Sequence, residues 1–263
     1  MAIPYPFELT IVFLRYRLLA ALLFAVSQAV GAQPTERSYA ILSLIGDSVS
    51  IHTVRSDLGG RIPGENKIVL PYPSSVFDQA ALLAAGSAIK ALAPGARTTL
   101  MMSQDLALYQ AQNAMFEAAA SNQDNRNYLL SLLKAQKVSH LVLITKLRDN
   151  AALELSNGFA GHGRLEGLGF FVDDTIEVRT NESRELRNGI VAPFAYVKVR
   201  LLDASTLAVV HEVKATESMI VARPSTAAAA GTWAAVSDAD KVAYLGQLIT
   251  QALEAATPDL LPR

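Results

Sequence analysis

The stretch PFAYVKVRLLDASTLAVVHEVKATES, from Pro193 to Ser218, has the clearest secondary-structure pattern in the chain. Apolar and polar residues alternate with a period of two in both of its halves, which is typical of two β-strands that each have one apolar and one polar face. Between the halves, the segment DAST, residues 203–206, supplies side chains that can hydrogen-bond to a turning backbone. We therefore predict a β-hairpin.

The segments on either side of this hairpin alternate between strand-like and helix-like periodicity. Apolar runs indicate strands, and residues with helical spacing indicate a first helix that starts near Ser75 and a last helix near the C-terminus. This order predicts an α+β or α/β fold, in which helices pack on a mixed β-sheet with hairpins to form a layered sandwich. The predicted strands are 39–45, 48–54, 98–102, 138–148 and 170–180, and the predicted helices are 75–92, 103–120, 128–136 and 240–256.

Two local features refine this prediction near the start of the domain. Gly46-Asp47 separates the first two strands, which suggests a tight hairpin turn in which Gly46 supplies a positive φ. Ser75 and Asp78 have the spacing of a capping box at the start of the first helix.

Residues 1–32 have the pattern of a secretory signal peptide. Arg15 and Arg17 precede an apolar run over 18–30, which ends in the small residues Gly31 and Ala32. The alternative is a retained anchor, but it would place both arginines within the span, at about 2.5–3.5 kcal/mol each near its centre. We expect export to the periplasm, with full secretion as the alternative, and no stable membrane span after cleavage.

The composition narrows the possible function classes. Removal of residues 1–32 changes the formal net charge from −1 to −2, so the sequence does not favour nucleic acid or an anionic membrane as partner. The absence of cysteine excludes disulfides, thiolate metal sites and lipid attachment through cysteine. With 51% hydrophobic residues, the chain can bury a substantial core in one domain.

We predict four regions along the chain. They are the signal peptide at 1–32, a mixed α/β domain at 33–222 with a glycine-rich insertion at about 150–190, a linker at 223–237, and a C-terminal helix at 238–263 that packs on the domain.

The glycine-rich insertion is the candidate binding element. It combines closely spaced glycines with apolar side chains that are costly to leave in water, which suggests a binding lid or an oligomerisation loop. The alternative is a tightly turned or flexible connection with no binding role. The candidate binding residues are Phe159, Gly161, His162, Gly163, Arg164, Leu168 and Phe170.

Gly46-Asp47-Ser48 after a buried strand resembles the first motif of the GDSL (SGNH) hydrolases, which would make Ser48 a nucleophile. A nucleophilic serine needs a base in hydrogen-bond reach and donors for the oxyanion. Asp203 and His211 are the nearest substitutes for the family's Asp-x-x-His, and its Gly-x-Asn-Asp segment has no counterpart here. In addition, a strand and not a helix follows Ser48, and His211 falls on the apolar face of its strand. The sequence therefore favours a protein that is not an enzyme.

No metal or cofactor site is predicted. The four histidines have no metal-ligand spacing, and the acidic residues around Asp173 form no loop of alternating oxygen ligands.

The segment order and the hairpin residues resemble the periplasmic α/β module shared by CsgG and the TolB amino-terminal domain. That module carries a hairpin of the form Arg-Leu-Val-Asp-x-x-Thr-Gly-x-Val-Val, and this chain departs from it at Leu207, where the module has its turn glycine. The resemblance implies a periplasmic fold and no catalytic residues. The matching residues are Arg200, Leu201, Leu202, Asp203, Thr206, Val209 and Val210.

Together these observations predict a non-enzymatic protein that binds another envelope component, or itself, through the glycine-rich insertion or an exposed sheet edge. Two alternatives remain open. One is a serine esterase that uses Ser48, and the other is a small-ligand-binding protein closed by a glycine-rich lid.

Overall fold

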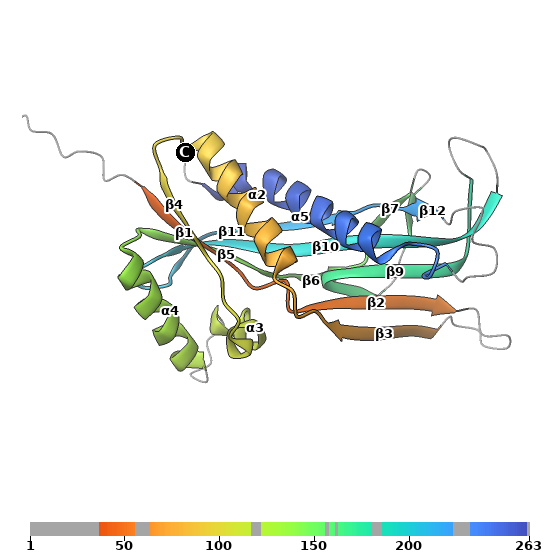
Figure 1. Ribbon diagram of the computed structural model, residues 1–263, viewed down its shortest axis with the longest axis horizontal. Helices are drawn as coiled ribbons and strands as arrows, with labels where there is room; N and C mark the ends of the chain where they lie inside the picture. Colours follow the sequence, from red (N-terminus) through yellow and green to blue (C-terminus); the bar gives the residue numbers. More distant parts are fainter. Residues whose placement is uncertain are drawn as a thin grey trace, which may run out of the picture. The chain divides into compact units, whose positions relative to one another are not determined.

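The computed structural model (Figure 1) describes residues 37–55, 64–116, 122–155, 158–160, 163–179, 186–222 and 232–261. The predicted signal peptide and residues 223–231 of the predicted linker lie outside the described residues. None of the helices in the described ranges is long and apolar enough to cross a membrane.

A mixed β-sheet forms the centre of the domain (Figure 1). Its strands, within the described residues, are β1 (Ser38–Ser43), β2 (Ser48–Arg55), β3 (Gly64–Pro71), β4 (Arg97–Met101), β5 (His140–Lys146), β6 (Arg148–Asn150), β9 (Arg164–Arg179), β10 (Leu186–Asp203), β11 (Val209–Ser218) and β12 (Val221–Ala222). β7 (Leu153–Leu155) and β8 (Gly158–Ala160) pair separately.

The long strand β10 organises the sheet. On one side it pairs with β11 and β12, and on the other side it pairs first with β9 and then, from Val197 onward, with β5. The next position in the sheet is also shared by two strands that follow one another: β1 pairs with β5, and β2 pairs with β9. The outermost row consists of β4 beside β1 and β3 beside β2. The sheet therefore splits along its length, with β5, β1 and β4 in one half and β9, β2 and β3 in the other.

Helices cover both faces of the sheet (Figure 1). On one face α2 (Val76–Leu92) packs on β1 and β4, and α5 (Asp238–Leu260) packs beside it on β10 and β11, where Tyr39 and Ile41 of β1 contribute to the core. α3 (Leu106–Ala111), a 3₁₀ turn (Ala114–Phe116) and α4 (Gln123–Gln136) lie on the other face, over Ala40 and Leu42. The predicted layered α+β architecture is therefore confirmed.

The central hairpin is confirmed by the antiparallel pairing of β10 with β11. As predicted, the turn is built on side chains: Asp203 Oδ1 accepts hydrogen bonds from the backbone N–H groups and hydroxyls of Ser205 and Thr206, at 2.6–3.0 Å. The prediction of one polar face is wrong for β10, because the sheet is covered on both faces there. Tyr196 is fully buried, and Arg200 is only 4% exposed.

The buried Arg200 is paired with several groups. Its Nε donates to Glu212 at 2.8 Å, its Nη1 donates to Asn113 Oδ1 at 3.2 Å, and its guanidinium lies 4.8 Å from the ring centroid of Phe116. These partners explain how a charged side chain is tolerated inside the sandwich.

The predicted hairpin at Gly46-Asp47 is wrong. β1 and β2 do not pair with each other but follow one another along the same row of the sheet. Gly46 does not have a positive φ. Glycine is required for space instead, because a Cβ at this position would lie 2.5 Å from Asp78 Oδ2.

The glycine-rich insertion belongs largely to the sheet. Its described part includes β9, which pairs with both β2 and β10. Two of its glycines make close approaches possible: Gly167 has φ +66° beside the side chain of Lys146, and a Cβ on Gly169 would meet Ser50 and Phe194. These glycines therefore serve packing within the sheet.

Candidate functional site

The segment Gly46-Asp47-Ser48 lies where the sheet splits, between the end of β1 and the start of β2. On the neighbouring row, β5 ends at Lys146 and the backbone of Leu147 bridges to β10 and β9, donating to Tyr196 O at 3.0 Å and accepting from Gly167 N at 3.1 Å. Regular strand pairing is therefore interrupted at this point, and polar groups of the backbone and side chains lie close together there.

Asp78 of α2 holds one side of the split. Its carboxylate is 4% exposed and accepts four hydrogen bonds. The donors are Ser43 Oγ (2.6 Å), Ile45 N (3.0 Å), Gly46 N (3.2 Å) and Tyr109 Oη (2.7 Å). Burial, and next the hydrogen bond to Asp78, raise the pKa of Tyr109. The predicted capping box is wrong, since Asp78 points into the split and Ser75 makes no side-chain cap hydrogen bond.

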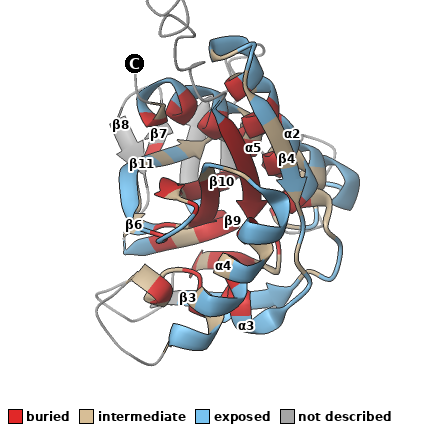
Figure 2. Ribbon diagram, turned by 90° about the vertical axis from the view of Figure 1, so that its left-hand side faces the viewer, coloured by how far each residue is buried: buried red, intermediate tan, exposed pale blue. Residues whose placement is uncertain are grey.

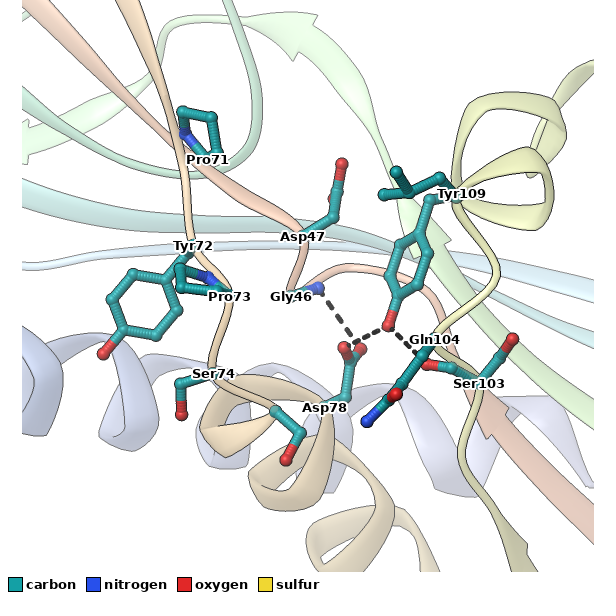
Figure 3. A pocket seen from close by; sticks show the side chains of 12 residues that line it. Gly46, Asp47, Pro71, Tyr72, Pro73, Ser74, Asp78, Ser103, Gln104 and Tyr109 are labelled. Atoms are coloured by element: carbon teal, nitrogen blue, oxygen red, sulfur yellow. Dashed lines mark hydrogen bonds between the residues drawn. The ribbon is translucent and has the colours of Figure 1, made fainter.

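A cavity of about 450 Å³ opens beside Asp78 (Figure 3). Figure 3 shows the Tyr109 hydroxyl pointing to Asp78 and Ser103, with Tyr72 and Pro73 on the opposite wall. The lining combines hydroxyl, amide and apolar groups with the carboxylates of Asp47 and Asp78. The Asp78 carboxylate is already satisfied by protein donors.

Ser48 has a lysine partner on the other side of the split. Lys146 Nζ donates to Ser48 Oγ at 2.7 Å and forms an ion pair with Asp47 Oδ1 at 2.5 Å. In this arrangement Lys146 donates its hydrogen bond to Ser48 Oγ and does not accept one from it. Ser48, Ser50, Lys67, Lys146 and Glu166 surround a small cavity of about 190 Å³ here.

The structure does not bring together the three catalytic candidates. Ser48 begins β2, whereas His211 lies on β11, three strands away across β9 and β10. His211 is opposite Leu201, five residues along β10 from the level of Ser48, so the two side chains are about 20 Å apart. Asp203 lies still farther along β10 and is occupied by the turn. His211 is exposed, which corrects its predicted place on an apolar face.

The candidate binding residues of the insertion fall into four groups. Leu168 and Phe170 are buried in the core, so the prediction that they line a binding surface is corrected. Gly163 and Arg164 are exposed at the start of β9. Phe159 lies in β8. Gly161 and His162 lie outside the described residues.

The described residues contain no group of three or more His, Cys, Asp or Glu side chains arranged to hold a metal ion.

The outer row of the sheet carries a group of exposed apolar side chains. In Figure 2, exposed residues follow β3 and the outer surfaces of α3 and α4, while buried residues concentrate in β9 and β10. β3 and β4 both run toward the cavity beside Asp78, so these side chains follow one edge of the sheet. They are Ile68 (52% exposed), Val69 (54%) and Leu70 (46%) of β3, Leu100 (46%) of β4, Met102 (52%) directly after β4, and Leu106 (66%), the first residue of α3. We call this group the apolar edge.

No family model and no curated protein matches this chain. Among solved structures, a neuraminyllactose-binding hemagglutinin homolog from Helicobacter pylori is 7% identical with a TM-score of 0.35, covering 84% of this chain and 78% of that chain. The PelC dodecamer from Paraburkholderia phytofirmans is 10% identical with a TM-score of 0.30, covering 84% and 89%. A DUF330 protein from Xanthomonas campestris is 14% identical with a TM-score of 0.33, covering 87% and 88%. These TM-scores are too low to support an inference about function.

Sequence reasoning missed Lys146, Tyr109 and the apolar edge. Lys146 ends an apolar strand and Tyr109 lies in a helical stripe, so neither has a local signal for its role. The sequence does contain a signal for the β3 part of the apolar edge. Ile68-Val69-Leu70 is a run of three apolar residues between a charged loop and Pro71, which fits a short β-strand.

Proposed function

We propose that this protein is a non-enzymatic component of the cell envelope that binds another envelope protein through the apolar edge. The observation that supports the proposal most directly is the row of exposed aliphatic side chains along β3 and β4. Sheet edges in natural proteins are usually protected by charges, prolines or covering segments, and an exposed apolar edge is a template for strand pairing.

The β4 half of the edge suits an extended apolar segment. A groove of about 440 Å³ runs between β4, α3 and α4, and its lining includes Leu100, Met102, Leu108 and Tyr128. A partner strand would pair with the free backbone groups of β4 and place alternate side chains in this groove. We therefore expect the partner to contribute a β-strand rich in apolar residues.

The face of the edge that adjoins α2 widens this surface. Leu100 packs beneath Gly86, where the Cβ of any larger residue would lie 3.3 Å from the Leu100 side chain. Leu83 lies one helical turn before Gly86 and is 62% exposed. The apolar surface thus extends from the sheet edge onto α2.

A photo-crosslinking amino acid placed at Met102 tests this proposal in intact cells. We expect one defined adduct with another envelope protein. The matched control places the crosslinker at Lys214, an exposed position on β11 at the opposite margin of the sheet. Adducts of the same pattern from both positions, or no adduct from Met102, would contradict the proposal.

The envelope location is part of the proposal and rests on the predicted signal peptide. Cell fractionation should find the protein in the periplasm or the medium, with its N-terminus near Gln33. Recovery of the unprocessed chain in the cytoplasm would overturn it. The resemblance to the CsgG and TolB amino-terminal module remains a prediction.

The Ser48 esterase is less well supported than binding, even though Ser48 has a hydrogen-bonded lysine. The ion pair with Asp47 occupies that lysine, and His211 is out of reach. We expect no labelling of the purified protein by a fluorophosphonate probe. Labelling that disappears in Ser48→Ala would establish the esterase instead.

A further inference from the structure

The backbone of β3 has hydrogen-bonding groups directed away from the sheet. Tyr72 N donates to Asp47 O at 2.7 Å, which places the Asp47/Tyr72 pair at a hydrogen-bonded position of the β2–β3 ladder. Hydrogen-bonded and non-hydrogen-bonded pairs alternate along an antiparallel ladder. The N–H and C=O groups of Lys67 and Val69 therefore point outward, and among the described residues no strand pairs with them.

The side chains of the same segment are apolar on both faces. Ile68 and Leu70 are opposite Ile51 and Val49, which belong to the core beneath α2 and α5, while Val69 is opposite Ser50 on the other face. All three side chains of the Ile68–Leu70 segment are about half exposed. A strand added at this edge would therefore extend the existing core beyond β2.

This segment is complementary to itself. In an antiparallel pair of β3 strands related by a two-fold axis at Val69, each Ile68 is opposite the Leu70 of the other copy. The two Val69 residues then exchange both of their outward hydrogen bonds, and Lys67 N–H meets the carbonyl of Pro71. Pro71 itself has no N–H, so it makes no bond to the Lys67 carbonyl of the other copy, while its pairing with β2 is unaffected. We propose that β3 pairs with β3 of a second copy of this chain.

Charge disfavours one of the neighbouring registers, and the match of aliphatic side chains favours the register centred on Val69. A pair centred on Lys67 would place two ammonium groups directly opposite one another, which is unfavourable. A pair centred on Ile68 would place each Lys67 against Val69 and each Asn66 against Leu70. The register centred on Val69 keeps the four aliphatic side chains of Ile68 and Leu70 together and separates the two Lys67 residues by about 13 Å.

This inference deepens the proposed function by assigning the two halves of the apolar edge to different partners. The second copy occupies β3, and the β4 groove stays available to another envelope protein. The dimer would then present two such grooves.

Single cysteine substitutions test the pairing in the full-length, exported protein, because the chain has no cysteine of its own. In the proposed register the two Val69 Cα atoms are about 5.5 Å apart, within the range that a disulfide spans. Mild oxidation should convert Val69→Cys to a covalent dimer. The matched control is Leu100→Cys, which is similarly exposed but lies on β4, and should stay largely monomeric.

Analytical ultracentrifugation provides an independent measurement. The unsubstituted protein should shift from monomer to dimer mass as its concentration rises, and Val69→Lys should abolish the shift while the thermal melting curve stays unchanged.

A protein that remains monomeric, or equal crosslinking of Val69→Cys and Leu100→Cys, would overturn the inference. Crosslinking of Val69→Cys to a different protein in cells would also overturn it. A monomer that still yields the Met102 adduct would overturn the dimer and leave the proposed function standing.

Discussion

At the residue scale, single polar side chains hold together the places where regular backbone pairing ends. Asp78 is the main example, because one buried carboxylate satisfies two backbone N–H groups and two hydroxyls where β1 gives way to β2. Asp203 does the same for the central hairpin turn. Each of these carboxylates replaces hydrogen bonds that a strand would otherwise have made.

Asp78→Ala should destabilise the protein by about 3–5 kcal/mol, since it leaves several buried donors without an acceptor. Ser75→Ala is the matched control on the same helix. An N-cap serine usually contributes about 1 kcal/mol, but Ser75 makes no cap hydrogen bond, so its loss should change stability by less than about 0.5 kcal/mol. Urea unfolding of both variants measures the difference, and equal effects would show that Asp78 acts only as a capping residue.

The hydrogen bonds to the Asp203 carboxylate should make the stability of the protein depend on pH in a specific way. Hydrogen bonds from Ser205 and Thr206 lower the pKa of Asp203 in the folded protein. Its contribution to stability is therefore complete above the ordinary aspartate pKa of about 3.9 and is lost as the pH falls through the lower folded-state pKa.

Asp203→Asn should accordingly be less stable than the unsubstituted protein at pH 7, by about 1 kcal/mol. The gap should close as the pH falls below about 4. Denaturant unfolding between pH 7 and pH 2 checks this, and a constant gap over the whole range would disprove the role of the ionised carboxylate.

At the element scale, the β10–β11 turn places a buried leucine in a conformation that favours glycine. Leu207 has φ 56° and is 1% exposed, packed with Leu202 in the core beneath α3 and α4. The left-handed conformation costs a side-chain-bearing residue about 1–2 kcal/mol. Burial of the leucine side chain offsets that cost.

Leu207→Ala and Leu207→Gly should therefore rank in an unusual order. Both should be destabilised by about 2–5 kcal/mol through loss of the buried side chain, but the glycine variant should be the more stable by about 1 kcal/mol. At Leu202, a buried strand position without positive φ, alanine should instead be more stable than glycine by about 0.5–1 kcal/mol. Thermal or urea unfolding of the four variants tests this, and the same order at both positions would refute the argument.

At the scale of the whole domain, two connections hold the halves of the split sheet together. One is the long strand β10, and the other is the chain segment between β1 and β2. Lys146 links them from the side, since its ammonium binds Asp47 and Ser48 while its methylenes cross Gly167 of β9. Its side chain is 14% exposed, and that of Asp47 is 27% exposed. This ion pair is therefore better shielded from water than the Lys67–Glu166 pair at the sheet surface.

Lys146→Met keeps most of the aliphatic chain but leaves Asp47 without its cation, so we expect a loss of about 2 kcal/mol. The matched control is Lys67→Met, which breaks a 3.7 Å pair with Glu166 whose side chains are both 39% exposed. That loss should be below about 1 kcal/mol. Unfolding at dilute protein concentration compares the two, and a Lys67→Met effect as large as that of Lys146→Met would contradict the assignment.

Local patterns were sufficient to predict the β10–β11 hairpin, its Asp203 turn and the positions of α2 and α5. In each case the deciding interactions lie within a few residues or on one face of a helix. The same reasoning failed at Gly46-Asp47, where a turn between strands and a passage between two halves of a sheet have the same local sequence. In the glycine-rich insertion it found the strand at 170–180 but not its earlier start in β9, since close packing and flexibility both require glycine.

The sequence by itself determined the α+β class, the strand and helix periods and the absence of thiol chemistry, because these depend on composition and on neighbours along the chain. Only the tertiary structure decided that β1 pairs with β4 and β5, that Lys146 meets Asp47 and Ser48 at the split, and that Ser48 and His211 lie far apart. It also decided that, within the described residues, the β3–β4 row stays uncovered. These outcomes depend on contacts between residues that are distant in the chain, where packing of the whole core selects among pairings that are locally equivalent.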